Sequence, residues 1–506
     1  MAKNKNRISK QQHVEAPPPK PKNFIDRIFN LSHSGSDWKK EIIAGITAFL
    51  GTAFLMLVVP KIFGIAYQQN GMIEETVAFA TLIVVVLANL ASGILTNLPY
   101  VLAPSVATTL AMMSVLTYMS DSPNTMFGLI LIAGVIFLAI TILPIGKHII
   151  QSFPKGLRYS AVLGLGLMLV LMGLQASGLF GSALGSSKIA EQLAGQVYNI
   201  FPMSHSINIF DTRLLIFLIG LICVGYFIFT KAKHPYLWTI LLTTIIGLFF
   251  ISETFGGGVA NSGWISPHPD FMNVFNFKSG LIYLPDTSQW LSSNLLQPSN
   301  LFSIFGKTAI IGIGTVVMLI VRDIFSASGT LAGLATLEGR MGPNDNDFKN
   351  SHRALMVQGG SKVLSGVFGA APVEYVPESS VGIAAGGKTG ITAVVYAGCA
   401  ILAIFLLPLF RSIPMVALAP VFIAIGLSFI KFAQEINWKD TLESIPAIVV
   451  IVMTMVTWNI AIALMWGIII QLCLCVAVWK FEKTNAGLWT LGVVSLVGLV
   501  LFYIGQ

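Results

Sequence analysis

Three acidic residues lie inside apolar stretches of this sequence, where an unpaired charge is costly. They are Asp323, Glu374 and Glu378, out of 22 Asp and Glu residues in the chain. An ionisable side chain at membrane depth faces a partner or a cavity, and such residues often bind a substrate or relay a proton. Glu378 follows Pro377 at the predicted start of a short helix, whose free N–H groups attract a carboxylate. Because burial opposes the charge that the helix end favours, this carboxyl could take up and release a proton.

Alternative roles stay open for each of these acids. Glu378 could simply cap a helix, without transport chemistry. Asp323 follows Arg322, so it serves either transport or a local ion pair, and the sequence does not decide between them. Glu374 falls in a segment predicted to be extended, where a structural or access role is favoured. All seven histidines lie outside the apolar stretches, which argues against imidazole as a proton carrier at membrane depth.

A phosphate-binding pattern occurs at Gly382–Thr389, which matches the P-loop letter for letter. That motif requires a preceding strand, a following helix and a surrounding α/β sheet. Here a short apolar stretch precedes it and another apolar span follows, so we interpret it as a glycine-rich turn at the cytoplasmic membrane face. The four cysteines have no metal-ligand spacing, and no Ser/His/Asp set lies at membrane depth. We therefore predict no cofactor and no metal, and a membrane-embedded enzyme is the least favoured class.

The elements that hold these residues must be membrane helices. Of 506 residues, 55% are hydrophobic and only 10% are charged, against about 25% in a typical soluble domain. The mean hydropathy is +0.79. This composition excludes a secreted disulfide scaffold, a disordered protein and a soluble enzyme with one anchor. The net charge of +8 comes from residues scattered at the ends of apolar runs, so it builds no groove for nucleic acid.

Apolar runs of roughly 20 residues predict membrane spans, and this chain has fourteen candidates. The third and tenth are too short to cross alone, and the thirteenth is overlong and should break near Met455–Thr457. The predicted fold is an all-α membrane protein. The candidate spans are 42–65, 76–98, 105–118, 125–146, 157–179, 213–230, 236–255, 308–325, 354–371, 378–387, 391–410, 413–432, 443–479 and 487–504.

The distribution of Lys and Arg predicts the orientation of the chain. Residues 1–40 hold nine of them and are read as a disordered cytoplasmic tail. With this tail inside, the inner segments carry more than twice as many basic residues as the outer ones, and Arg322 and Lys362 fall within spans. We therefore expect a multi-pass protein of the inner or plasma membrane, with both termini in the cytoplasm. The long loops at 180–212 and 256–307 then face outside.

Two similar segments predict an internal repeat. Pro99–Ser105 and Pro372–Glu378 each place two prolines five residues apart, followed by a polar residue and a short apolar stretch. Proline removes a backbone donor, so each segment should be extended and followed by a half-helix. Seven spans precede the second half of the chain, which gives the two halves inverted topology. Paired broken segments of this kind indicate the substrate site of a secondary transporter, although two unrelated proline kinks would give the same letters.

The segment Pro377–Gly390 resembles the Glu-Ser-x-x-Gly-x-x-x-Gly-Gly-Arg-Thr-Gly signature of the xanthine/uracil permease family, also called nucleobase–ascorbate transporters. It is most similar to the azaguanine-type branch of hypoxanthine, guanine and adenine permeases. The resemblance runs from about residue 41 to the C-terminus. Further matching elements are Ala44–Leu50, Asn97–Pro104, Ser328–Leu331, Ile413–Pro420, Trp438–Asp440 and Glu443–Ala447.

The resemblance implies a fold of two inverted seven-span repeats divided into a core domain and a gate domain. The core would comprise residues 41–150 and 308–411, and the gate residues 151–255 and 412–506, with 256–307 as an outer loop. It also implies an elevator motion of the core against the gate, usually with proton symport. The gate often mediates a homodimer.

The resemblance implies a set of site residues, with departures in spans 3 and 8. Glu378 matches the family's span-10 carboxylate, whereas the span-8 carboxylate falls on Ser326, with Asp323 one turn earlier. In span 3 the expected Asn is Thr109, and two glycines are missing. The predicted substrate-binding residues are Phe49, Ser105, Thr108, Thr109, Ser326, Glu378 and Ser379. Glu378 and Asp323 are the predicted proton-coupling residues.

The leading hypothesis is a proton-coupled importer of a purine or related nucleobase. A transporter of the same fold for another small solute, such as sulfate or an organic anion, is the alternative. Two opposed half-helix N-termini would suit an anion, although the acidic Glu378 argues against one. Uptake of labelled nucleobases and sulfate would separate the two hypotheses.

Overall fold

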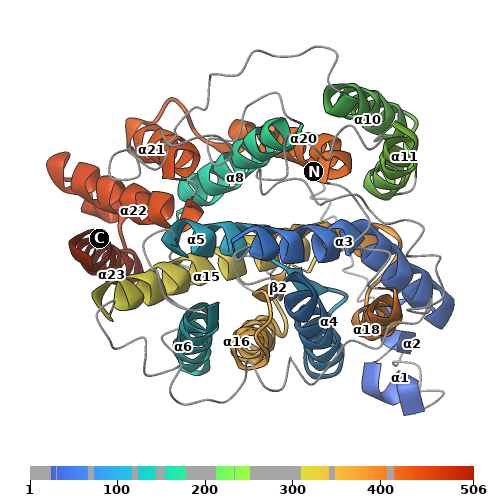
Figure 1. Ribbon diagram of the computed structural model, residues 1–506. Coiled ribbons are helices and arrows are strands. Elements are labelled where there is room, and N and C mark those ends of the chain that lie inside the picture. The colour runs from blue at the N-terminus through green and yellow to red at the C-terminus, as the bar shows by residue number, and fades with distance from the viewer. Residues whose placement is uncertain are drawn as a thin grey trace, which may run out of the picture.

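The chain folds as a helical membrane protein (Figure 1). The computed structural model describes residues 24–29, 31–66, 73–116, 123–143, 154–177, 212–232, 234–250, 309–340, 348–406, 415–457 and 459–505. The predicted outer loop at 256–307 lies outside the described residues. So do most of the predicted tail at 1–40 and all but the last residue of the loop at 180–212.

Most predicted spans correspond to helices. Seven helices among the described residues are long and apolar enough to cross a membrane, and five shorter apolar helices accompany them. A total of fourteen spans stays a prediction. The longer helices are α3 (Trp38–Ala66), α4 (Ile73–Ala91), α6 (Pro123–Ile142), α8 (Lys155–Ala176), α10 (Thr212–Phe229), α11 (Pro235–Phe250), α15 (Ala309–Glu338), α16 (Ser351–Phe368), α18 (Ile391–Phe405), α20 (Met415–Phe429), α21 (Thr441–Thr457), α22 (Ile460–Ala477) and α23 (Ala486–Gly505). Two short helices, α1 (Phe24–Phe29) and α2 (Leu31–Ser34), precede α3.

One predicted boundary is wrong, whereas the break predicted near Met455–Thr457 is confirmed. The span predicted to end at residue 325 continues in α15 to Glu338, so the Ser328–Leu331 motif is helical. The overlong run at 443–479 is two helices, α21 and α22. Asn459 caps α22, and its Oδ1 accepts hydrogen bonds from the N–H groups of Ala461 and Ile462 at 2.9 and 3.2 Å. A side-chain cap of this kind satisfies helix N–H groups that lipid cannot.

Both proline-flanked segments are extended and lead into short helices, as predicted. Strand β1 (Leu102–Pro104) leads into α5 (Val106–Leu116), and strand β2 (Val373–Tyr375) leads through the 3-10 turn η4 (Pro377–Ser379) into α17 (Ser380–Ala384). The strands pair antiparallel, with Ala103 opposite Glu374. Each strand thus supplies backbone partners to the other, which is the condition for extended chain at membrane depth.

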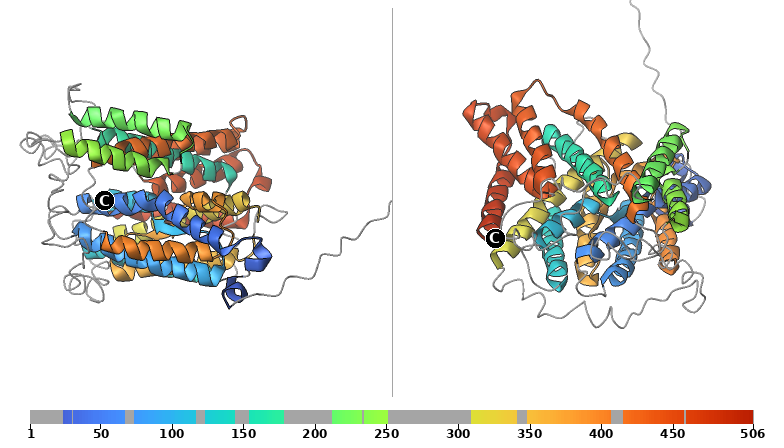
Figure 2. Two further views of the ribbon diagram at one scale, coloured as in Figure 1. Left: turned by 90° about the vertical axis from the view of Figure 1, so that its right-hand side faces the viewer. Right: turned by 45° about the horizontal axis from the view of Figure 1, so that its top comes forward.

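The strand pair lies at the middle of the molecule, next to the long helices α3 and α15. In Figure 1, helices α4, α6, α16 and α18 lie below this level, whereas α8, α10, α11, α20 and α21 lie above it. Figure 2 shows that most helices run roughly along a common direction. The pairs α6 with α16, α8 with α20, and α3 with α18 are in extensive contact. The central segments therefore lie between two helical layers.

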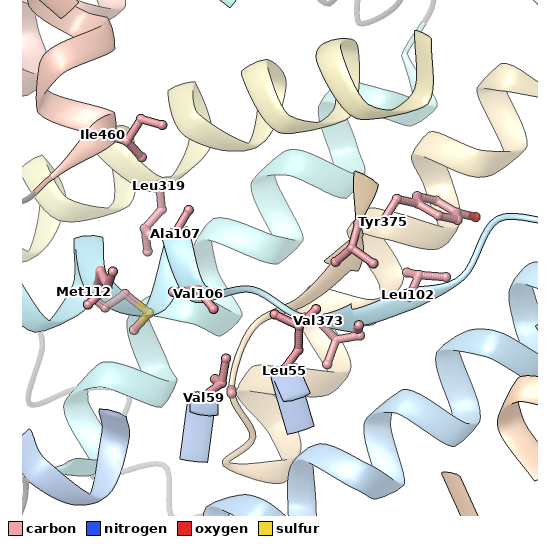
Figure 3. Close-up of a cluster of buried hydrophobic side chains, with 14 of the residues drawn as sticks. Leu55, Val59, Leu102, Val106, Ala107, Met112, Leu319, Val373, Tyr375 and Ile460 are labelled. Atoms are coloured by element: carbon pink, nitrogen blue, oxygen red, sulfur yellow. The ribbon is translucent and has the colours of Figure 1, made fainter. Parts of the chain in front are cut away.

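A buried apolar cluster surrounds the strand pair (Figure 3). It joins side chains from α3, from both broken segments, from α15 and from α22, so elements far apart in the sequence share one core. The labelled members are Leu55, Val59, Leu102, Val106, Ala107, Met112, Leu319, Val373, Tyr375 and Ile460. Close packing of these side chains holds the two broken segments, and the polar residues that they carry, in fixed positions.

Candidate functional site at the paired half-helices

Glu378 stands at the start of the second half-helix and is only partly buried. The preceding Val376 is extended, with φ −113° and ψ 143°, so the carboxylate lies at the junction between strand and helix. Among the described residues, no side chain donates a hydrogen bond to it. A carboxylate at a half-helix N-terminus that keeps its oxygens free can accept N–H groups from a ligand.

Aromatic side chains lie near Glu378. Helix α3 contacts both η4 and α17. It carries the partly buried Phe49, whose ring packs edge-on against that of Tyr396 with the ring centroids 5.5 Å apart. The Tyr396 hydroxyl and Thr52 Oγ1 form a hydrogen bond of 2.7 Å. Tyr236 of α11 packs edge-on against Phe54 of α3 at 6.3 Å. Both tyrosines are within electrostatic range of Glu378.

Glu374 is bound to a cation, in contrast to Glu378. It is 4% exposed, and Arg322 holds both of its oxygens. Arg322 Nη2 donates to Oε1 at 2.5 Å, and Nη1 donates to Oε2. Nη2 also donates to Ser105 Oγ at 2.8 Å, so the guanidinium joins β2 to the start of α5. This two-pronged geometry is the strong form of the Arg–carboxylate pair.

A second buried ion pair completes what we call the charged cluster, defined as Arg322, Asp323, Lys362 and Glu374. The ammonium of Lys362, on α16, pairs with Asp323 Oδ1. It also lies 4.0 Å from Glu374 Oε2, while Arg322 Nη1 lies 3.6 Å from Asp323 Oδ1. Two positive and two negative charges cancel, and all four residues are buried. Unpaired charges at such depth would be strongly destabilising.

Most of the predicted substrate-binding hydroxyls are bonded within the protein, and that of Ser379 links the two segments. Ser105 caps α5, because its Oγ accepts from the N–H of Thr108 at 3.2 Å, and the Thr108 hydroxyl donates to the same oxygen at 3.1 Å. Thr109 Oγ1 donates to the carbonyl of Ser105 at 2.7 Å. Ser379 Oγ both donates to and accepts from the backbone of Val101, at 3.0 Å each. Ser326 is buried on α15, near the charged cluster in sequence.

The structure thus links Ser105 and Asp323 to the charged cluster and Ser379 to the first broken segment, and it adds two residues that we had not assigned to the site. Arg322 and Lys362 were recognised only as basic residues within spans. Their position inside predicted apolar spans was the available signal, because a cation there needs a buried anion. For Asp323 the sequence left a local ion pair open, and its bonded partner is Lys362 of α16 rather than its neighbour Arg322.

The segment with the P-loop pattern is a turn whose anion position is filled by the protein itself. The buried carboxylate of Glu41, on α3, accepts the N–H groups of Lys388 and Thr389 at 3.0 and 3.3 Å. It also accepts the Thr392 hydroxyl at 2.6 Å. Gly386 adopts φ 102°, which only glycine tolerates readily. In a P-loop such N–H groups bind phosphate, whereas here they bind Glu41.

Neither metal-ligand groups nor disulfides occur among the described residues. No group of three or more His, Cys, Asp or Glu side chains gathers there. The four cysteines, which lie in this part of the chain, form no disulfide. The polar chemistry of the described residues is therefore concentrated at the broken segments and at the Glu41 turn.

Comparisons with known proteins agree with this architecture. A permease family model for xanthine/uracil permeases matches residues 39–466. The adenine permease AdeQ of Escherichia coli (strain K12) is 29% identical over 467 residues, which cover 91% of this chain and 93% of AdeQ. The guanine/hypoxanthine permease GhxP of Escherichia coli O157:H7 is 27% identical over 482 residues, covering 95% and 97%.

Among solved structures, the transmembrane domain of a cyanobacterium bicarbonate transporter, BicA, has a similar fold. Its TM-score is 0.57 and its sequence identity is 18%, with 85% of this chain and 97% of that chain covered. At this identity the likeness describes the fold alone.

Proposed function

Because this chain belongs to the xanthine/uracil permease family of membrane transporters, we propose that it imports a purine base by proton symport. The family and the two relatives are permeases rather than enzymes, and they support transport of purines or related nucleobases. The identity of the base, the coupled proton and the direction of transport are our proposal.

The state of Glu378 is the observation that carries this proposal. Of the three acids predicted within the membrane, it is the one whose carboxylate is not bound by a cation among the described residues, since Glu374 and Asp323 are held by Arg322 and Lys362. A purine presents ring N–H donors to such a carboxylate. One charge in an otherwise apolar and aromatic setting is typical of sites that orient a small ligand.

We propose that Phe49 supports the plane of the base and that Glu378 accepts its N–H groups. An aromatic ring suits a flat heterocycle because the face of the ring can stack on the face of the base. Ser105, Thr108, Thr109 and Ser379 would act on the ligand indirectly, by fixing the two segments. Ser326 would line the site from α15.

The transport cycle we propose is an elevator motion of a core domain, residues 41–150 and 308–411, against a gate domain, residues 151–255 and 412–506. The contact between Phe54 of the proposed core and Tyr236 of the proposed gate lies where the two would slide. Protonation of Glu378 together with base binding would remove its charge before the core moves, which lowers the cost of crossing an apolar barrier. Two inverted seven-span repeats, cytoplasmic termini and a homodimer through the gate belong to this proposal.

The test is uptake into proteoliposomes with an imposed proton gradient. Labelled adenine, hypoxanthine, guanine, uracil and sulfate are offered to the unchanged protein, to Glu378→Gln and to Glu482→Gln. The last is a matched control, because Glu482 is an exposed acid in the turn Phe481–Lys483. We expect accumulation of a purine by the unchanged protein and the control, and no accumulation by Glu378→Gln. Accumulation of sulfate alone would overturn the proposal.

A further inference from the structure

Lys362 is a cation sealed inside the protein. Its side chain is 2% exposed, and α6 packs directly over it. A Cβ added at Gly134 of α6 would lie 2.8 Å from the backbone nitrogen of Val363 and 3.0 Å from Lys362 Cβ. The close approach that glycine permits brings α6 against the backbone of α16 at Lys362, and the Lys362 side chain is buried.

The groups around this ammonium are oxygen donors from separate elements. Asp323 of α15 binds it directly, and Glu374 Oε2 of β2 lies 4.0 Å away. Because Arg322 engages both oxygens of Glu374, the charge of Asp323 is balanced chiefly by Lys362. The other charged group facing Asp323 is Arg322 Nη1, at 3.6 Å.

Two further buried polar groups near this position have unused hydrogen-bonding capacity. Asp323 Oδ2 is fully buried and has no hydrogen-bond partner among the described residues. The side-chain amide of Gln358 is also fully buried, and neither of its polar atoms has a partner among those residues. Gln358 lies one turn before Lys362 on the same face of α16. Carboxylate and amide oxygens are the ligands that hard cations prefer.

We propose that Asp323 and Glu374 form an internal cation site and that the Lys362 ammonium permanently occupies it, in the place of a metal cation. The cation site itself does not depend on the proposed transport function, and only its expected effect on uptake rests on that proposal. A tethered ammonium supplies the positive charge in every conformation and cannot be released. Import by this chain would therefore need no sodium or potassium, and protons would be the coupling ion.

The first experiment removes the ammonium and looks for binding of a metal cation, without any nucleobase present. Lys362→Ala leaves a charge deficit and the space of the lost side chain, so sodium can enter. Lys362→Met removes the charge but refills much of the space with an apolar chain. We expect sodium, added in place of choline, to raise the thermal unfolding temperature of Lys362→Ala by several degrees. It should not do so for the unchanged protein or for Lys362→Met.

A double variant identifies the site. Lys362→Ala combined with Asp323→Asn removes both charges of the pair, so the sodium response should disappear. A sodium response that persists in the double variant, or that the unchanged protein shares, would overturn the proposal. So would the absence of a response to sodium, lithium and potassium in Lys362→Ala. Monodisperse elution of each variant confirms that the folded protein is being compared.

The second experiment measures uptake of whichever base the unchanged protein accumulates. In choline buffer Lys362→Ala should lose uptake by about a hundredfold, the scale set by an uncompensated buried charge. Sodium should restore much of that loss. If Lys362→Ala takes up the base without sodium as fast as the unchanged protein does, the tethered-cation role is overturned. Failure of every nucleobase to enter would refute the proposed substrate, whereas the thermal measurement would still decide the cation site.

Discussion

The two broken segments share a backbone plan but differ in chemistry. Each runs from an extended stretch into a half-helix, and the polar residue after the second proline is Ser105 in the first segment and Glu378 in the second. Ser105 is buried and fully engaged, since it caps α5 and accepts from Arg322. Glu378 is partly exposed, and no side chain among the described residues forms an ion pair with it. The two segments thus share the same backbone arrangement, but only the second carries an ionisable residue, Glu378, after its second proline.

The same contrast occurs within the second segment, between two acids four residues apart. Glu374 lies on the strand and faces Arg322, whereas Glu378 lies beyond it, on the 3-10 turn. On this difference we expect the first acid to serve the structure and the second to bind a ligand. The following variants test this division, beginning with the largest effect.

The variant Glu378→Gln should abolish proton-driven accumulation, by at least about a hundredfold, because an amide cannot exchange the proton. Binding or exchange of the base can persist, since the amide still offers a carbonyl oxygen. Ser105→Ala is the matched change in the first segment. It should keep measurable accumulation, because Arg322 retains Glu374. Uptake in vesicles with an imposed gradient measures both, and normal accumulation by Glu378→Gln would remove the contrast between the segments.

Changing Glu374→Gln should act mainly on stability. It leaves the Arg322 guanidinium without its buried counter-charge, a loss of about 3–5 kcal/mol. Thermal unfolding in detergent should show a marked fall, with less folded protein recovered from membranes. The double variant Arg322→Met with Glu374→Leu should recover part of the stability, because it removes both charges. A stable Glu374→Gln protein that has lost only transport would instead make Glu374 a ligand-binding residue.

Asp323→Asn should impair uptake more than Ser326→Ala does. The amide cannot balance the Lys362 ammonium, whereas loss of the Ser326 hydroxyl leaves every ion pair of the charged cluster in place. We expect roughly tenfold loss or more for the first and a small change for the second, on the scale of a single neutral hydrogen bond. Initial uptake rates at equal protein levels compare them. The reverse order would assign the functional contact on α15 to Ser326.

The smallest effects should come from the glycine-rich turn. Glu41→Gln replaces a charged acceptor of two backbone N–H groups, which should cost about 1–3 kcal/mol of stability. Lys388→Arg should be nearly silent, because the Lys388 side chain is exposed and the turn uses its backbone. Arg340 Nη2 contacts the Lys388 carbonyl at 2.5 Å, which does not depend on the side chain at 388. Loss of uptake in Lys388→Arg at normal stability would show that this side chain takes part in transport.

The parts of the fold that sequence could predict are those set by local rules. Proline spacing predicted both extended segments, and apolar runs predicted most of the helices. The pairing of β1 with β2 and of Lys362 with Asp323 was not predicted, because it depends on contacts between remote elements.

In the candidate site, too, the sequence predicted features set by nearby residues and missed contacts between remote ones. Glu378 could be selected because its motif and helix position are local in sequence. Ser379 was predicted as a substrate ligand, yet its hydroxyl is bonded to Val101, 278 residues away in sequence. No rule of spacing gives such a partner. The end of α15 at Glu338 was missed because polar residues after 325 hid a helix that stays partly buried.

The pairing of β1 with β2 has a consequence for biosynthesis. Leu102 lies opposite Tyr375, so a strand made early waits for one made much later. Until then the strand has only the partners that the first half supplies, such as the Asn89 side chain, which bonds both backbone groups of Leu102. Each hydrogen bond that stays unmet within the membrane is costly. Contacts so distant along the chain also delay folding. We infer that the first half of the chain completes its fold in the membrane only after the second half has been synthesised and inserted.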